Sequence, residues 1–166
     1  MRTYREGVGQ KIGHDLILEV ERWEATVEVD EGGAVSALRL EADSRSLAVL
    51  EGLHGVKPLS DRDRREIAKT IDQKVLMGRP IEFESTDIAQ GLSVSGRLTM
   101  AGATRPASFE VSVSEDGLVE AEIPVTQSSW GIKPYRGFMG ALKVRDTVEV
   151  VVTAQLPTAP AAAAGP

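Results

Sequence analysis

The sequence predicts an all-β protein, an antiparallel barrel of about eight strands with one inserted amphipathic α-helix. Apolar and polar residues alternate in short segments along most of the chain, which puts one face of each segment inside and the other in water. Turn-forming pairs such as Gly32-Gly33 and Asp116-Gly117 separate successive segments. One stretch, residues 60–77, has helical spacing instead. About eight strands are enough to close an up-and-down barrel.

The first third of the chain contains the least regular of the expected strands. Alternating segments are found at 16–23, 26–29 and 37–42, and a further segment at 46–50 extends the third. In the first of them Leu16, Leu18 and Val20 share a face. The two glycines at 32–33 permit the positive φ angles that a tight hairpin needs.

The helix is expected to start at Ser60, whose side-chain oxygen can accept a bond from a free amide of the first turn. Ile67, Ile71 and Val75 follow at four-residue spacing and form a narrow apolar stripe, and the helix ends before Gly78. A single helix of this kind, inserted in a run of strands, is expected to pack across a barrel opening or flank.

The later strands show the clearest alternation. They are expected at 81–85, 92–100, 107–113, 118–125 and 147–156. The alanine- and proline-rich tail, residues 157–166, is expected to be disordered, so that residues 1–156 form a single domain.

The composition limits the kinds of molecule that the protein is expected to bind and the chemistry that it can use. The chain has 19 basic and 25 acidic residues and a net charge of −6, which argues against a general nucleic-acid or anionic-membrane surface. It has no cysteine, so disulfides and thiolate chemistry are excluded. No segment approaches the roughly 20 apolar residues of a membrane span, so integral membrane insertion is not expected. Residues 1–9 lack the apolar run of a signal peptide, which predicts a cytoplasmic location.

Catalytic signatures are weak. The chain has two histidines, His14 and His54, whereas a zinc site usually needs three or four ligands. There is no Gly-x-Ser-x-Gly elbow, and acidic pairs such as Glu19 and Glu21 lie on an outward strand face. We therefore expect no catalytic residue, metal or cofactor, and predict that the protein is not an enzyme.

Two motifs in the last third carry a family resemblance. Residues 96–113 read Gly-x-Leu-Thr-x-x-Gly-x-Thr-Arg-Pro and then a strand, and residues 128–135 contain Ser-Ser-Trp-Gly-Ile before a final strand that opens on Asp146-Thr147-Val148. Upstream, residues 79–86 contain Pro-Ile-Glu-Phe-Glu-Ser. These motifs resemble those of the YceI-like family, which includes polyisoprenoid-binding proteins. The similarity extends from about Gly13 to Thr153.

The resemblance implies a lipocalin-like barrel around an elongated apolar cavity, with a hydrophobic or amphiphilic small molecule as partner. The ligand would be an isoprenoid, quinone-like or fatty-acyl lipid, carried or sequestered without a covalent bond. A homodimer is also plausible for such a barrel.

The inward apolar residues of the strands are the candidate ligand-binding residues, together with aromatic and apolar residues between the last two strands that would line or cap the mouth. They are Leu16, Leu18, Val20, Leu38, Leu40, Phe83, Val94, Leu98, Phe109, Val111 and Ile123 on the strands, and Trp130, Tyr135, Phe138 and Met139 at the mouth. Alternation alone does not distinguish a hollow barrel from a filled one. The alternatives are a ligand-free barrel acting as a protein-interaction or stress-related scaffold and, last, a small hydrolase or isomerase built around His14 and His54.

Overall fold

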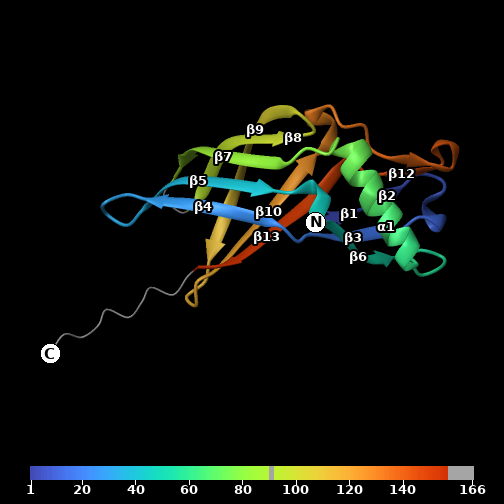
Figure 1. The fold of residues 1–166 in the computed structure, drawn as a ribbon, viewed down its shortest axis with the longest axis horizontal. Helices are drawn as coiled ribbons and strands as arrows, with labels where there is room; N and C mark the ends of the chain where they lie inside the picture. Colours follow the sequence, from blue (N-terminus) through green and yellow to red (C-terminus); the bar gives the residue numbers. More distant parts are fainter. Residues whose placement is uncertain (90–91, 157–166) are drawn as a thin grey trace.

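The computed structural model describes residues 1–89 and 92–156; the tail at 157–166, expected to be disordered, lies outside the described residues. Its main feature is a large curled antiparallel sheet with one short helix beside it (Figure 1). The prediction of an all-β barrel class with one inserted helix is confirmed.

The sheet has ten strand segments in the order β4-β5-β7-β8-β9-β10-β13-β1-β3-β6. Their bounds are β1 (Arg2–Thr3), β3 (Asp15–Val20), β4 (Trp23–Val29), β5 (Val35–Ala42), β6 (Leu47–Leu53), β7 (Ile81–Ile88), β8 (Ser93–Met100), β9 (Ala103–Val113), β10 (Leu118–Thr126) and β13 (Thr147–Gln155).

The count exceeds the predicted eight because β1 was not predicted and because β6, expected to extend the third segment, is separate from β5. Both arms of the first hairpin are broken. Only two residues separate β3 from β4, and a 3₁₀ turn at Ser44–Ser46 separates β5 from β6. Backbone bonds bridge the break, from Glu21 N to Ser46 O at 3.2 Å and from Asp43 N to Arg22 O at 3.0 Å. One half of this hairpin joins the sheet through β7 and the other through β1, so the sheet curls round towards itself.

The helix is shorter than predicted. α1 spans Asp61–Thr70 and widens into a π-helical turn at Ile71–Val75, instead of continuing as an α-helix to residue 77. Its start is as predicted: Asp63 N donates to Ser60 Oγ at 3.2 Å, and Ser60 N donates to the Asp63 carboxylate at 3.0 Å. The end comes at Met77 and Gly78, which both have positive φ.

Two apolar clusters form the core. Ile67 and Ile71 of the helix pack, as expected, against a small cluster of Leu18, Leu47 and Val49 from β3 and β6. The larger cluster lies under β7, β8, β10 and β13, and its buried members are Phe83, Val94, Leu98, Met100, Val125, Trp130, Ile132 and Val148. The helix thus covers the half of the hairpin formed by β3 and β6 (Figure 1). The part of the sheet that contains β7, β8, β10 and β13 curls over the larger cluster.

A second, three-stranded sheet, not predicted from the sequence, lies near the helix end of the molecule (Figure 1). Its order is β11 (Arg136–Gly137), β12 (Leu142–Val144) and β2 (Arg5–Glu6). Strands of two or three residues are too short to show alternation, which is why the sequence pattern missed them.

Candidate functional site

The predicted binding residues on the strands share the inner face of the curled sheet. Directly opposite residues of an antiparallel pair lie on one face, and the ladders pair Leu40 with Phe83, Phe83 with Leu98, and Val94 with Phe109. Leu18, Phe83, Val94 and Leu98 are buried, whereas Leu16, Val20, Leu38, Leu40, Phe109, Val111 and Ile123 are only partly buried. The structure thus brings the predicted residues of β5 and β7–β10 together around the larger cluster, and places Leu16 and Leu18 in the smaller one.

Part of the inner face is not covered by protein. Val27 of β4 lies opposite Leu38, and Val113 of β9 lies opposite Val119, so both point to the inner side. They are nevertheless 46 % and 43 % exposed, and Trp23, also on β4, is 38 % exposed. An apolar face that the fold leaves open in this way is a candidate surface for an apolar ligand.

Close packing dominates elsewhere on this face. Gly96 is buried, and a Cβ added there would lie 2.5 Å from Cζ of Phe83, closer than real contacts allow. The glycine is therefore needed for the fit of the Phe83 ring. A large residue at position 96 would disrupt packing and would not serve as a clean block of a cavity.

The sheet opens between β9 and β10. β9 pairs with β8 along residues 103–110, but with β10 only at residues 111–113. Each separating strand contains a proline, Pro106 on β9 and Pro124 on β10, and proline cannot donate a ladder hydrogen bond. The missing donors help to explain why the two strands diverge here.

A hollow of about 350 Å³ occupies this divergence, and we call it the split hollow. Inner-face residues (Leu98, Ala107, Ile123, Val125 and Trp130) and outward residues (Pro106, Ser108 and Thr126) both line it. The split hollow is therefore bordered both by the apolar inner face and by outward side chains.

Trp130 and Arg105 define the two ends of the split hollow. The Trp130 indole is buried, and its Nε1 donates to the Leu98 carbonyl at 2.8 Å. Arg105 is exposed, and its guanidinium donates to the Ser129 carbonyl at 3.2 Å and to the Thr104 carbonyl at 2.9 Å. Among the described residues, Arg105 is the one charged residue in the lining of the split hollow, so the opening is apolar inside and cationic at its rim.

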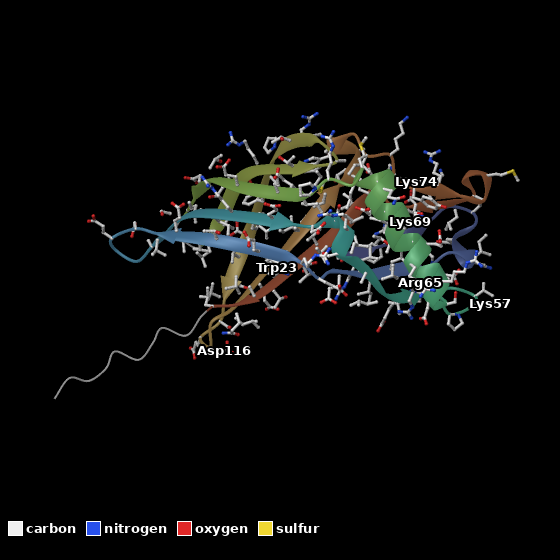
Figure 2. All side chains as sticks on the ribbon, viewed as in Figure 1. Trp23, Lys57, Arg65, Lys69, Lys74 and Asp116 are labelled. Atoms are coloured by element: carbon white, nitrogen blue, oxygen red, sulfur yellow. The ribbon has the colours of Figure 1, made fainter. Side chains whose placement is uncertain are left out.

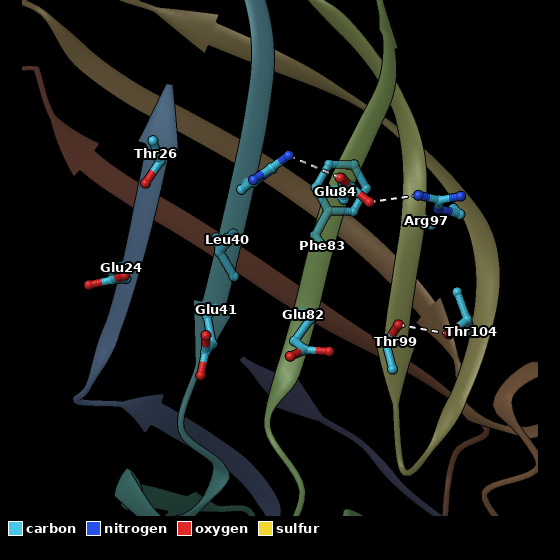
Figure 3. A pocket seen from close by; sticks show the side chains of 11 residues that line it. Glu24, Thr26, Leu40, Glu41, Glu82, Phe83, Glu84, Arg97, Thr99 and Thr104 are labelled. Atoms are coloured by element: carbon cyan, nitrogen blue, oxygen red, sulfur yellow. Dashed lines mark hydrogen bonds and ion pairs between the residues drawn. The ribbon is translucent and has the colours of Figure 1, made fainter. Parts of the chain in front are cut away.

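A larger hollow, about 690 Å³, lies on the other side of the sheet and is polar. Figure 3 shows this outer hollow, where Glu84 lies between Arg39 and Arg97 at 3.4 Å and 2.6 Å. Hydrogen bonding and charge from Arg97, then the charge of Arg39, lower the pKa of Glu84. This arrangement of paired surface charges does not suit a long apolar chain, and we base the candidate site on the inner face and the split hollow.

The histidines do not form a metal centre among residues 1–89 and 92–156, where no group of three potential ligands is found. His54 Nδ1 lies 2.9 Å from the Asp15 carboxylate, whereas His14 Nε2 contacts the Lys57 carbonyl at 2.7 Å. Burial alone would raise the pKa of Asp15, but hydrogen bonds from the Arg5 amide and His54 lower it overall. These contacts hold the loop after β6, which contains His54 and Lys57, against His14 and Asp15 at the start of β3, and their role is structural.

Of the four residues expected at the mouth, the three with described side chains differ in burial. Trp130 belongs to the larger core cluster, whereas Tyr135 and Met139 are exposed. The side chain of Phe138 lies outside the described part of the structure. Sequence reasoning also missed Arg105, Trp23 and Val27; the alternation of β4 would have indicated Trp23 and Val27.

Comparison with known proteins places the fold. A family model described as the YceI-like domain matches residues 19–156. The chain belongs to the YceI-like family. The match confirms the resemblance seen in residues 79–86, 96–113 and 128–153.

Solved structures agree with this chain in fold at low sequence identity. Burkholderia cenocepacia BcnA is 15 % identical with a TM-score of 0.56, and the match covers 91 % of this chain and 95 % of that one. The Campylobacter jejuni YCEI protein is 13 % identical with a TM-score of 0.59, covering 92 % and 94 %. A cysteine mutant of the Campylobacter jejuni protein with a monobromobimane guest is also 13 % identical, with a TM-score of 0.60 and the same coverage of both chains. No match was found among curated proteins.

The described residues of this YceI-like chain contain no helix long and apolar enough to cross a membrane.

Proposed function

We propose that the protein binds a long-chain amphiphile, with the apolar chain on the inner face of the sheet and the polar head at the split hollow. The observation that supports this most directly is the exposure of Val27, Val113 and Trp23 on the inner face. Each methylene group that such a face buries contributes about 0.8 kcal/mol, so a long chain binds without a charged clamp.

The ligand class follows from the lining and from the family. The larger cluster on the inner face contains Phe83, Phe109 and Trp130 and is otherwise made of Val, Leu, Ile, Ala and Met side chains, which suits a flexible prenyl or acyl chain. Arg105 at the rim of the split hollow favours a head group that carries negative charge or accepts hydrogen bonds. An isoprenoid, quinone-like or fatty-acyl lipid fits this description, and we propose binding without catalysis, with no metal or other cofactor.

The alternative is a ligand-free scaffold that binds protein, including a second copy of this chain, along the free edge of β4. The edge has features that discourage strand pairing: Glu24 and Glu28 on its outer face and a register shift between Glu28 and Val29. These features favour the hypothesis of amphiphile binding over assembly through pairing of β4 edges.

The first experiment is native mass spectrometry of the protein from its own host, followed by organic extraction. A stoichiometric prenyl or acyl species supports the proposal. A ligand-free mass, together with failure to bind added prenyl alcohol and fatty acid, overturns it in favour of the scaffold.

Two tryptophan substitutions on neighbouring residues test the location. Ala25 is exposed on the inner face opposite Leu40, whereas Thr26 is exposed on the outer face opposite Arg39. We expect Ala25→Trp to reduce ligand occupancy and Thr26→Trp to leave it unchanged, because only the first side chain enters the inner side. Equal occupancy in both variants would contradict binding on this part of the inner face.

A further inference from the structure

Charge is segregated along the molecule. Three segments lie at the helix end, residues 7–14, 52–60 and 131–145; we call them the tip loops, although the second begins in β6 and the third includes β11 and β12. They contain six basic residues and no acidic one: Lys11, Lys57, Lys133, Arg136, Lys143 and Arg145. At the opposite end, residues 28–33 and 110–122 contain eight acidic residues and no basic one. Figure 2 shows Lys57 at one end of the long axis and Asp116 toward the other. One end of the molecule is therefore rich in basic residues, although the net charge of the chain is −6.

The three loops form one continuous surface, which we call the basic tip. Gly9 N donates to the Ala141 carbonyl at 2.9 Å, and His14 Nε2 meets the Lys57 carbonyl at 2.7 Å. These contacts join the first loop to each of the other two. The basic groups of the tip consequently act on the same approaching surface.

Acidic residues border the basic tip, namely Glu6, Asp15, Glu51, Asp61 and Asp146, but among the described residues no ion pair joins them to its lysines or arginines. Within the described part of the chain, none of Lys11, Lys57, Lys133 and Lys143 enters an ion pair. Of the two acids that flank the first loop, Asp15 is engaged by Arg5 and His54, whereas Glu6 lies opposite Lys143 in the small sheet. The side chain of Asp146, next to the third loop, accepts hydrogen bonds from Ser128.

Apolar side chains project from the same loops. Val8 is 95 % exposed, Val56 is 72 % exposed and Met139 is fully exposed. Met139 also has a φ of 55°, a left-handed conformation that non-glycine residues rarely adopt, at the tip of its turn. Each of the three loops thus presents one strongly exposed apolar side chain beside lysines.

We propose that the basic tip docks on the surface of an anionic lipid bilayer, with Val8, Val56 and Met139 entering the headgroup layer. Isolated apolar side chains among lysines match a membrane interface, which receives each side chain separately and attracts the surrounding cations. The acidic opposite end is repelled by the same surface, which orients the molecule. This inference does not depend on the proposed ligand.

Vesicle co-sedimentation tests the proposal with the full chain. We expect binding to vesicles of phosphatidylcholine mixed with phosphatidylglycerol, weak binding to phosphatidylcholine alone, and loss of binding at high salt. One basic residue near an anionic surface changes binding by about fivefold, so Lys11→Gln with Lys133→Gln should weaken it roughly 25-fold. Val8→Ser with Met139→Ser should weaken binding to the same vesicles without removing its salt dependence.

Matched controls separate docking from net charge and general hydrophobicity. Arg39→Gln with Arg97→Gln makes the same change in net charge on the outer face of the sheet, and Val151→Ser removes an apolar side chain exposed on the outer face. Both controls should bind as the wild type does. The proposal is overturned if the wild type does not bind anionic vesicles, if it binds both vesicle types equally, or if the controls weaken binding as much as the tip variants.

Discussion

The indole Nε1 of Trp130 donates a hydrogen bond to the Leu98 carbonyl, at 2.8 Å and in a buried position. This bond joins the 3₁₀ turn at Gln127–Trp130, which follows β10, to the middle of β8. Between them the sheet is split, because β9 and β10 pair only at one end. Trp130 therefore closes the inner side of the split hollow. Replacing it tests how much its hydrogen bond to Leu98 stabilises this part of the sheet.

Replacing the indole with a phenyl ring removes the hydrogen-bond donor and part of the ring contacts, and should destabilise the protein. For Trp130→Phe we expect the free energy of unfolding to fall by about 1–3 kcal/mol, since the Leu98 carbonyl loses a buried partner. Trp130→Ala should cost about 3–5 kcal/mol because a cavity is added. Guanidinium denaturation measures both, with Trp23→Phe as the exposed control. A Trp130→Phe variant as stable as the wild type would show that the bond contributes little.

The two tryptophans should report different environments. Trp130 is buried and Trp23 is partly exposed, and the chain has no other tryptophan. Trp23→Phe should emit at shorter wavelength and be quenched by iodide several-fold less than Trp130→Phe. Fluorescence spectra with an iodide titration make the comparison. Equal quenching of the two single-tryptophan variants would contradict the burial of Trp130.

A buried serine fastens the end of the helix to the broken hairpin. Ser44 is 1 % exposed, and its Oγ donates to the Asp72 carboxylate at 2.7 Å. We expect Ser44→Ala to lower the free energy of unfolding by about 1–3 kcal/mol, because the partly buried carboxylate loses its partner. Urea denaturation measures the change. Ser36→Ala, at an exposed position of β5, is the control, and a similar small effect from both variants would argue against a role for the bond.

Acid should weaken the outer ion network. Arg97 and Arg39 hold the pKa of Glu84 below its ordinary value of 4.5, so ionised Glu84 stabilises the fold above that pH. The contribution is lost as the pH falls through the lowered pKa. Between about pH 5 and pH 3 the wild type should lose more stability than Glu84→Gln, and the difference should shrink in high salt.

The matching measurement is urea denaturation across this pH range. Glu82→Gln is the control, since Glu82 forms no ion pair within the described residues. Parallel pH profiles for the wild type and Glu84→Gln would show that the arginines do not stabilise the ionised form.

The strands of the large sheet from β7 onward could be predicted because their apolar residues alternate and their turns contain glycine. The predicted segments at 81–85, 118–125 and 147–156 overlap β7, β10 and β13 closely. In the first hairpin, the break between the first two segments was expected at residues 24–25 but lies at 21–22, and residues 46–50 were expected to extend the third segment. The bend depends on contacts of Asp43 and Ser46 with Arg22, which are distant in sequence. The helix end was missed for a related reason: residues 71–75 keep helical spacing while they widen into a π turn.

The sequence predicted which residues lie on the inner face of the sheet, but it did not predict the split hollow between β9 and β10. Alternation assigned Leu38, Phe83 and Phe109 to the inner side, and the structure confirms that side. The separation of β9 from β10 depends on how far two strands stay paired, a property of the whole sheet. Arg105 acquires its place at the rim only through that separation.

The sequence by itself determined which side chains face inward, because a strand repeats every two residues whatever its neighbours are. It also determined the family, through the motifs at 96–113 and 128–135. Only the tertiary structure decided where the inner face stays open and how the charges are distributed. Closure and charge segregation depend on which loops meet at each end of the molecule, and residues such as Val8 and Met139 are brought together from opposite ends of the chain.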